Sequence, residues 1–153
     1  MKCYKYILYI GLFVLIIGLG VYIFLSTKDH WQHHYTQSEI ALKNDQYQNA
    51  IDSCNKAIEL QPNHPNTYKV YVNKAKALNK LHRYKEAIES ANQAIAFNPH
   101  SEEAYETKVY PLFQLQREEE LTVVLEEIIV LDPHTPLKGF LNSLRVDRGK
   151  VKY

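Results

Sequence analysis

One sequence block recurs within the chain, and this repetition constrains the fold more than any other feature. Residues 47–62 (YQNAIDSCNKAIELQP) align with residues 84–99 (YKEAIESANQAIAFNP). A more diverged third copy keeps the same steps of three, four, three and five residues at Glu118, Leu121, Leu125, Ile128 and Pro133. Most of the chain is therefore predicted to be one structural unit, repeated.

Steps of three and four residues place the recurring positions on one face of an α-helix. Each copy is therefore predicted to form a helix with one buried stripe. Small side chains in that stripe let a neighbouring helix approach closely; they are Ala50, Ala57, Ala87, Ala91 and Ala94. The proline that closes each copy cannot continue the helix, so the chain must turn back there.

A second helical stretch precedes each block, at residues 31–43, 66–81 and 102–115. In the second stretch, Tyr68, Tyr71, Ala75 and Leu78 recur at helical spacing. The predicted unit is therefore helix, turn, helix and proline, and the fold class is all-α.

The period, the helix pair and the closing proline together resemble the tetratricopeptide repeat over about residues 31–133. The resemblance implies a solenoid over residues 29–134 with three helix-turn-helix repeats, at about 31–64, 66–100 and 101–134. The third copy has larger residues in its stripe, as expected for a terminal copy with fewer neighbours. Residues 135–153 are predicted to hold a helix that caps the last apolar face, followed by a basic tail.

Pro111 stands inside the predicted first helix of the third copy. A proline there removes one backbone hydrogen bond and kinks a regular helix. The sequence therefore predicts that the carbonyl oxygen of Thr107 loses its helical partner.

Residues 6–25 form a run of twenty residues without a charge. As a helix this run would extend about 30 Å, which matches the hydrocarbon core of a bilayer. The run is longer than the apolar core of a cleavable signal peptide, and no small-x-small cleavage site follows it. Residues 1–28 are therefore predicted to be a single transmembrane anchor.

The positive charges that precede this run are those of the amino terminus, Lys2 and Lys5, and the positive charge that follows it is that of Lys28. The positive-inside rule then favours a cytoplasmic amino terminus and an extracytoplasmic repeat domain. Cys3 and Cys54 would lie on opposite sides of the membrane, which excludes a disulfide between them. The hypothesis that Cys3 is acylated rests on its position alone, and an unmodified thiol is the simpler expectation.

Catalytic motifs are missing from the repeats. No glycine stands between positions 21 and 138, so a glycine-rich phosphate loop cannot form there. Neither Cys-x-x-Cys nor His-Glu-x-x-His occurs, and His30 with His34 supplies only two imidazoles, too few for a metal site. We therefore expect no enzyme activity and no cofactor.

Charge is distributed unevenly along the repeats. Residues 69–85 hold six basic residues and no acidic one, whereas residues 102–132 hold nine acidic residues and two basic ones. The acidic region would repel phosphate and the net charge is only +1, so nucleic acid is not an expected partner.

In tetratricopeptide proteins the first helices of successive units line a concave groove that holds an extended or helical peptide. Carried over by helix spacing, the resemblance implies that this groove is lined by Tyr35, Glu39, Lys69, Val72, Lys76, Lys80, Glu103, Glu106 and Tyr110. One subgroup binds a chaperone's C-terminal carboxylate through lysines and asparagines. Here only Asn73 matches that pattern, and the other positions are Tyr35, Glu39, Glu103 and Thr107. We therefore do not expect that ligand.

These features predict a single-pass membrane adaptor that binds a protein or peptide in its groove and contacts the bilayer through residues 6–25. A structural subunit of a larger membrane complex, associating through its transmembrane helix, is the alternative. Gly11 and Gly18 lie one heptad apart and would give such a helix a smooth face.

Overall fold

A computed structural model describes residues 2–150 of the chain, with side chains at residues 12–21 and 30–146. The regular secondary structure of the described part is α-helix alone. The helices are α1 (Lys2–Lys43), α2 (Tyr47–Leu60), α3 (Thr67–Lys80), α4 (Tyr84–Phe97), α5 (Glu102–Gln114), α6 (Glu118–Leu131) and α7 (Leu137–Lys150). The predicted all-α solenoid of helix pairs is confirmed.

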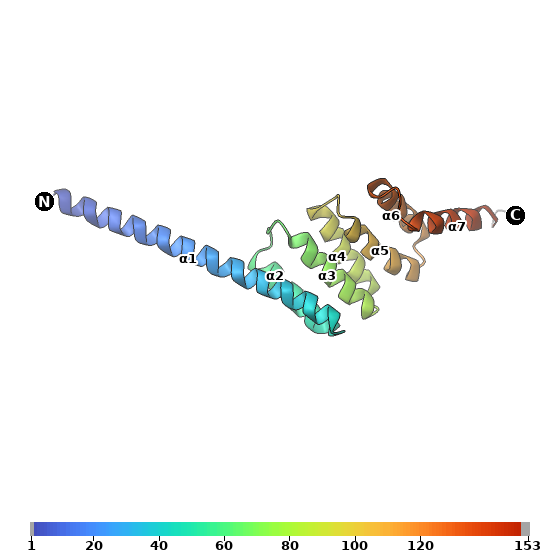
Figure 1. Ribbon diagram of the computed structural model, residues 1–153, viewed down its shortest axis with the longest axis horizontal. Helices are drawn as coiled ribbons and strands as arrows, with labels where there is room; N and C mark the ends of the chain where they lie inside the picture. Colours follow the sequence, from blue (N-terminus) through green and yellow to red (C-terminus); the bar gives the residue numbers. More distant parts are fainter. Residues whose placement is uncertain (1, 151–153) are drawn as a thin grey trace.

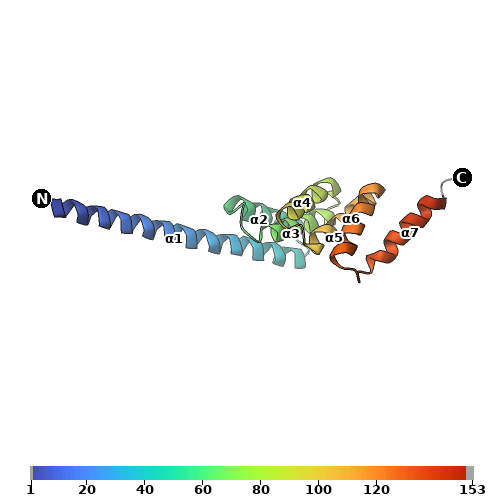
Figure 2. The same cartoon turned by 90° about the horizontal axis from the view of Figure 1, so that it is seen from above.

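The helices form a succession of pairs from left to right, with α1, α3 and α5 as neighbours (Figure 1). Helix α3 contacts both α1 and α5, and each of these three helices also contacts the helix that follows it. The amino-terminal part of α1 projects from the repeats on the side opposite α7 (Figure 2). Helix α7 packs on α6 and covers the end of the array.

The buried stripe is formed by the small residues that the repeat predicts. Ala50, Ala57, Ala87, Ala91 and Ala94 are all 0% exposed. In the third unit the stripe consists of larger side chains, which cluster with Leu141 of α7. Close helix packing in the first two units therefore gives way to a bulkier aliphatic core under the capping helix.

Polar side chains join the first helices to one another. Asn73 of α3 donates from Nδ2 to Ser38 Oγ of α1 over 3.0 Å, and Ser38 donates in turn to the carbonyl of Tyr35. On the other side of α3, Asn79 Nδ2 donates to the carbonyl oxygen of Thr107 in α5 over 2.9 Å.

This second bond explains how α5 tolerates its proline. The helix continues through Pro111 to Gln114 although residue 111 has no N–H to offer the carbonyl of Thr107. The side chain of Asn79 supplies the missing donor. The sequence predicts that the Thr107 carbonyl loses its helical donor, and the structure shows that Asn79 Nδ2 takes its place.

The turn after each first helix contains one residue with a left-handed backbone. These residues are Asp45, His82 and Gln116, with φ angles of 57°, 59° and 55°. In each turn the next amide closes back on the helix, for example Arg83 N–H on the Leu78 carbonyl at 2.9 Å. This is the Schellman closure that glycine usually provides, and the same geometry reverses the chain in all three units.

Helix α1 is continuous from Lys2 to Lys43, so the predicted anchor and the first helix of the first repeat are one helix of 42 residues. Trp31 lies where the two predicted parts meet. Its side chain is 1% exposed and stacks on His64 at 3.7 Å and on Tyr35 at 5.5 Å between centroids. The repeat domain therefore begins without a flexible joint.

Within the described residues, no helix is long and apolar enough to cross a membrane. The predicted span, residues 6–25, lies partly outside the described side chains, which cover only 12–21 of it.

The Asn79 bond can be tested by a double-mutant cycle with Pro111. We expect Asn79→Ala to lower the free energy of unfolding by about 1–2 kcal/mol, because the Thr107 carbonyl loses its donor. In a Pro111→Ala background the loss should be smaller, because residue 111 then offers its own N–H. Urea unfolding of the full chain in detergent, followed by circular dichroism, measures both.

Gln93→Ala on the exposed face of α4 is the matched control and should change little in either background. An equal cost of Asn79→Ala with and without Pro111 would show that the side chain does not replace the helical bond.

Candidate functional site

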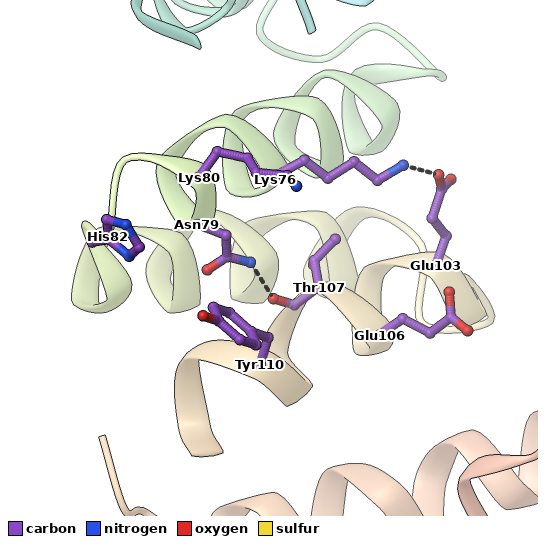
Figure 3. A pocket seen from close by; sticks show the side chains of 8 residues that line it. All are labelled: Lys76, Asn79, Lys80, His82, Glu103, Glu106, Thr107 and Tyr110. Carbon is purple, nitrogen blue, oxygen red and sulfur yellow. Dashed lines mark hydrogen bonds and ion pairs between the residues drawn. The ribbon is translucent and has the colours of Figure 1, made fainter. Parts of the chain in front are cut away.

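The first helices leave a hollow between α3 and α5. It has a volume of about 630 Å³ and is lined by Lys76, Asn79, Lys80, His82, Glu103, Glu106, Thr107 and Tyr110. Figure 3 shows that these side chains come from α3, from the turn after it and from the facing side of α5. We call this the α3–α5 cavity.

A second hollow lies between α1 and α3. It measures about 460 Å³ and is lined by Glu39, Leu42, Lys43, Asp45, Tyr47, Asn73, Lys76 and Lys80. Lys76 and Lys80 line both hollows. The two hollows therefore form one groove across α1, α3 and α5, with α3 in the middle.

One ion pair crosses the α3–α5 cavity. Lys76 Nζ lies 2.5 Å from Glu103 Oε1, with the two side chains 43% and 51% exposed. Figure 3 shows the pair at one end of the cavity and the Asn79–Thr107 bond near its middle. Because the pair is in contact with solvent, it contributes at most about 1 kcal/mol and can open at little cost.

The α5 wall of the cavity has excess negative charge. Partial burial raises the pKa of Glu106, and the nearby carboxylates of Glu102 and Glu103 raise it further, while Lys76 acts in the opposite direction. A positive group near Glu106 would relieve this repulsion.

In the α1–α3 hollow, by contrast, two of the positive charges are the ones without partners among the described residues. Its carboxylates are already engaged, since Tyr35 donates from its hydroxyl to Glu39 over 2.9 Å and Tyr47 donates to Asp45. Lys43 and Lys80 have no ion pair with any described residue. Two cations therefore remain available to a ligand.

The structure brings most of the predicted groove residues together. Lys76, Lys80, Glu103, Glu106 and Tyr110 line the α3–α5 cavity, and Glu39 lines the other hollow. Tyr35 lies beside Glu39 through their hydrogen bond.

Two of the predicted groove residues lie elsewhere. The ammonium group of Lys69 lies 5.9 Å from the ring centroid of Tyr68, and Lys69 lines neither hollow. The structure corrects the prediction that Val72 lines the groove. Its side chain is only 1% exposed and packs in the core with Ala94 and Ala104. Since α4 and α5 cover that side of α3, a residue at position 72 has no open surface to offer.

The structure also adds groove residues that the helix pattern does not predict. Asp45 and His82 occupy the left-handed turn positions, and Tyr47 starts α2. Their access to the groove depends on how the turns fold back. The available signal was a polar residue at the second position after the end of each first helix.

Within the described part of the chain, no group of three or more His, Cys, Asp or Glu side chains is arranged to hold a metal ion. The arrangement instead suits charged and aromatic contacts with a larger ligand.

The fold and its groove define a helical-repeat solenoid with an open inner face. Residues 33–99 match the family model described as tetratricopeptide repeat, and this match supports that family for the first two units. A search of the curated proteins gave no match.

Solved structures resemble the fold. The Arabidopsis OM64 TPR domain aligns with a TM-score of 0.72 and 20% identity, over 79% of this chain and 98% of that one. The second TPR domain of human RPAP3, in complex with an HSP70 peptide, gives 0.70 and 18%, over 78% and 98%. The TPR2B-domain:pHsp70-complex of yeast Sti1 gives 0.67 and 19%, over 79% and 97%. These identities support the tetratricopeptide fold alone.

The charge balance of the cavity predicts the response of Glu106 to Lys76. Lys76→Gln should raise the pKa of Glu106, because the positive charge that favours its ionised form is removed. Carboxyl carbon chemical shifts of the full chain, followed by NMR against pH, measure this value.

Lys69→Gln removes the same charge from a position that does not influence Glu106 and serves as the control. A Glu106 pKa that stays constant or falls in Lys76→Gln would mean that the two groups do not interact in solution.

Proposed function

We propose that this chain is a membrane-anchored adaptor that holds a segment of a partner protein in the groove of α1, α3 and α5. The observation that carries the proposal is a groove rich in exposed side chains that the fold itself does not use. Lys43, Lys80 and Glu106 have no ion pair with any described residue. Such groups remain free to select a ligand.

The similar structures support this proposal, since two of them are domains of the same fold in complexes, one with an HSP70 peptide and one with pHsp70. The ligand of the present chain should differ from those. Asn73 is already bonded to Ser38, and Lys76 is paired with Glu103. A C-terminal carboxylate would therefore find Asn73 engaged and would meet the carboxylates of Glu103 and Glu106 in the same groove.

Membrane attachment is supported by the surface of α1. Eight apolar side chains between residues 12 and 21 are 50–66% exposed; they are Leu12, Phe13, Val14, Leu15, Ile16, Ile17, Leu19 and Val21. Exposing apolar area to water costs about 25 cal/mol per Å². A bilayer around residues 6–25 removes this cost, and the charges at Lys2, Lys5 and Lys28 favour an extracytoplasmic repeat domain.

A structural subunit of a membrane complex is the second candidate. A Cβ atom added at Gly18 or Gly20 would meet no other atom within 4 Å, so the helix surface is smooth and open there. A neighbouring transmembrane helix could approach closely at such a surface.

The adaptor proposal predicts that groove charge controls capture of the partner. The tagged chain of residues 1–153 in detergent should lose its specific partners when it carries Lys76→Glu and Lys80→Glu, because both cations line both hollows. Quantitative mass spectrometry of the captured proteins measures the loss.

Lys56→Glu with Lys85→Glu makes the same change of charge on exposed positions of α2 and α4 and should retain the partners. Equal capture by both double variants would reject the groove. Loss of all partners from a fragment that begins at residue 29 would instead favour the structural subunit.

The anchor predicts that the chain stays in the membrane pellet after alkaline carbonate extraction. Leu15→Arg with Ile16→Arg should release it, because each arginine near the bilayer centre costs about 2.5–3.5 kcal/mol of insertion. Val123→Arg with Val130→Arg, on exposed positions of α6, is the matched control. Extraction of the unmodified chain by carbonate would refute the anchor.

A further inference from the structure

The groove separates its charges along its length. Lys43 lies in the α1–α3 hollow and Lys80 lines both hollows, whereas Glu103 and Glu106 lie on the α5 wall of the α3–α5 cavity. The Lys76–Glu103 pair joins the α3 and α5 walls of the α3–α5 cavity. A ligand that crosses the groove therefore meets positive charge over one part and negative charge over the next.

The α5 wall of the α3–α5 cavity suits a basic side chain, while Lys76 and Lys80 lie on the α3 wall. Glu103 and Glu106 supply carboxylates, and Tyr110 supplies an aromatic ring that is 48% exposed. Carboxylates hydrogen-bond an ammonium or guanidinium group strongly, and an aromatic face attracts the same cation.

A second observation in this cavity points to a missing hydrogen-bond donor. The Oδ1 atom of Asn79 is buried and accepts no hydrogen bond from any described residue. In Figure 3 the amide of Asn79 lies near Tyr110, with its nitrogen bonded to Thr107 and its oxygen turned the other way. A buried acceptor without a donor is costly, and a ligand N–H that reaches it would remove that cost.

The α1–α3 hollow suits an acidic side chain. Its lysines at 43 and 80 have no ion pair with a described residue, while its two carboxylates are engaged by tyrosine hydroxyls. A ligand carboxylate placed there would gain two cations and displace no existing pair.

Helix spacing sets the distance between the two regions. Packed helix axes lie about 8–10 Å apart. A peptide in the polyproline II conformation advances about 3.1 Å per residue with three residues per turn, so side chains three residues apart face the same way at about 9 Å from one another. We propose that the groove recognises a peptide segment with one acidic and one basic side chain about three residues apart. The acidic side chain lies against Lys43 and Lys80, and the basic one enters between Glu106 and Tyr110.

This specificity rests on the proposed function and narrows it to one class of ligand. A segment with two acidic side chains would place a carboxylate against Glu103 and Glu106, and one with two basic side chains would face Lys43 and Lys80. Like charges at these positions select against uniformly charged segments.

Four fluorescein-labelled heptapeptides of alanine and glycine test the pattern. They differ only at positions 2 and 5, which carry Glu and Lys, Lys and Glu, two Glu or two Lys. Fluorescence anisotropy measures their binding to the full chain in phosphatidylcholine nanodiscs at low salt. One mixed peptide should bind about tenfold more tightly than both uniform peptides, and its order gives the chain direction in the groove.

Two conservative variants assign the subsites. Glu106→Gln should reduce the preference of that mixed peptide over the two-Glu peptide, and Lys80→Gln should reduce its preference over the two-Lys peptide. Glu89→Gln and Lys85→Gln, on exposed positions of α4, are the matched controls and should leave both preferences unchanged.

Uniform peptides that bind as tightly as the mixed ones would overturn the inference. Binding preferences that Glu106→Gln and Lys80→Gln leave unchanged would also overturn it. So would the absence of binding by all four peptides at millimolar concentration. If the Lys76 and Lys80 charge reversals still abolish partner capture, only the charge pattern fails and the adaptor function stands.

Discussion

The close approach of helices across fully buried alanines is the constraint on which the rest of this structure depends. Ala50 and Ala57 in α2, and Ala87 and Ala94 in α4, expose no surface at all. A larger side chain at any of them would separate the helices that meet there. Because each second helix packs so closely, the first helices lie next to one another and share one open face. The groove is a product of this packing, and the turns after α1 and α3 add Asp45 and His82 to its lining.

Sequence periodicity predicts the helices and the buried stripe because both follow from residue spacing within one helix. It also predicts that Pro111 deprives Thr107 of a partner, which is a local effect. The replacement donor, Asn79, belongs to another helix and becomes visible only when α3 and α5 are placed together. Val72 is the opposite case. Its spacing suited the groove, but the packing of α3 against two neighbours buries it.

The candidate site could be predicted where it lies on regular helix and not where it lies on turns. Lys76, Glu103 and Tyr110 follow from helical spacing carried over to the first helices. Asp45 and His82 line the groove from turns in which their backbone is left-handed, a conformation that no spacing rule assigns to them. The separation of charge was visible as blocks along the sequence, but the structure alone shows which carboxylates are already engaged.

Because helix α1 is continuous, the orientation of its first half in its surroundings determines the direction in which the groove faces. A helix advances about 1.5 Å and rotates about 100° with each residue. Inserting one residue between the apolar run and Trp31 would therefore turn the whole groove by about 100° around the helix axis, with almost no change in height. Seven inserted residues would restore nearly the original heading about 10 Å further out. The number of residues in this segment thus determines the orientation of the groove about the axis of α1, which a flexible linker could not do.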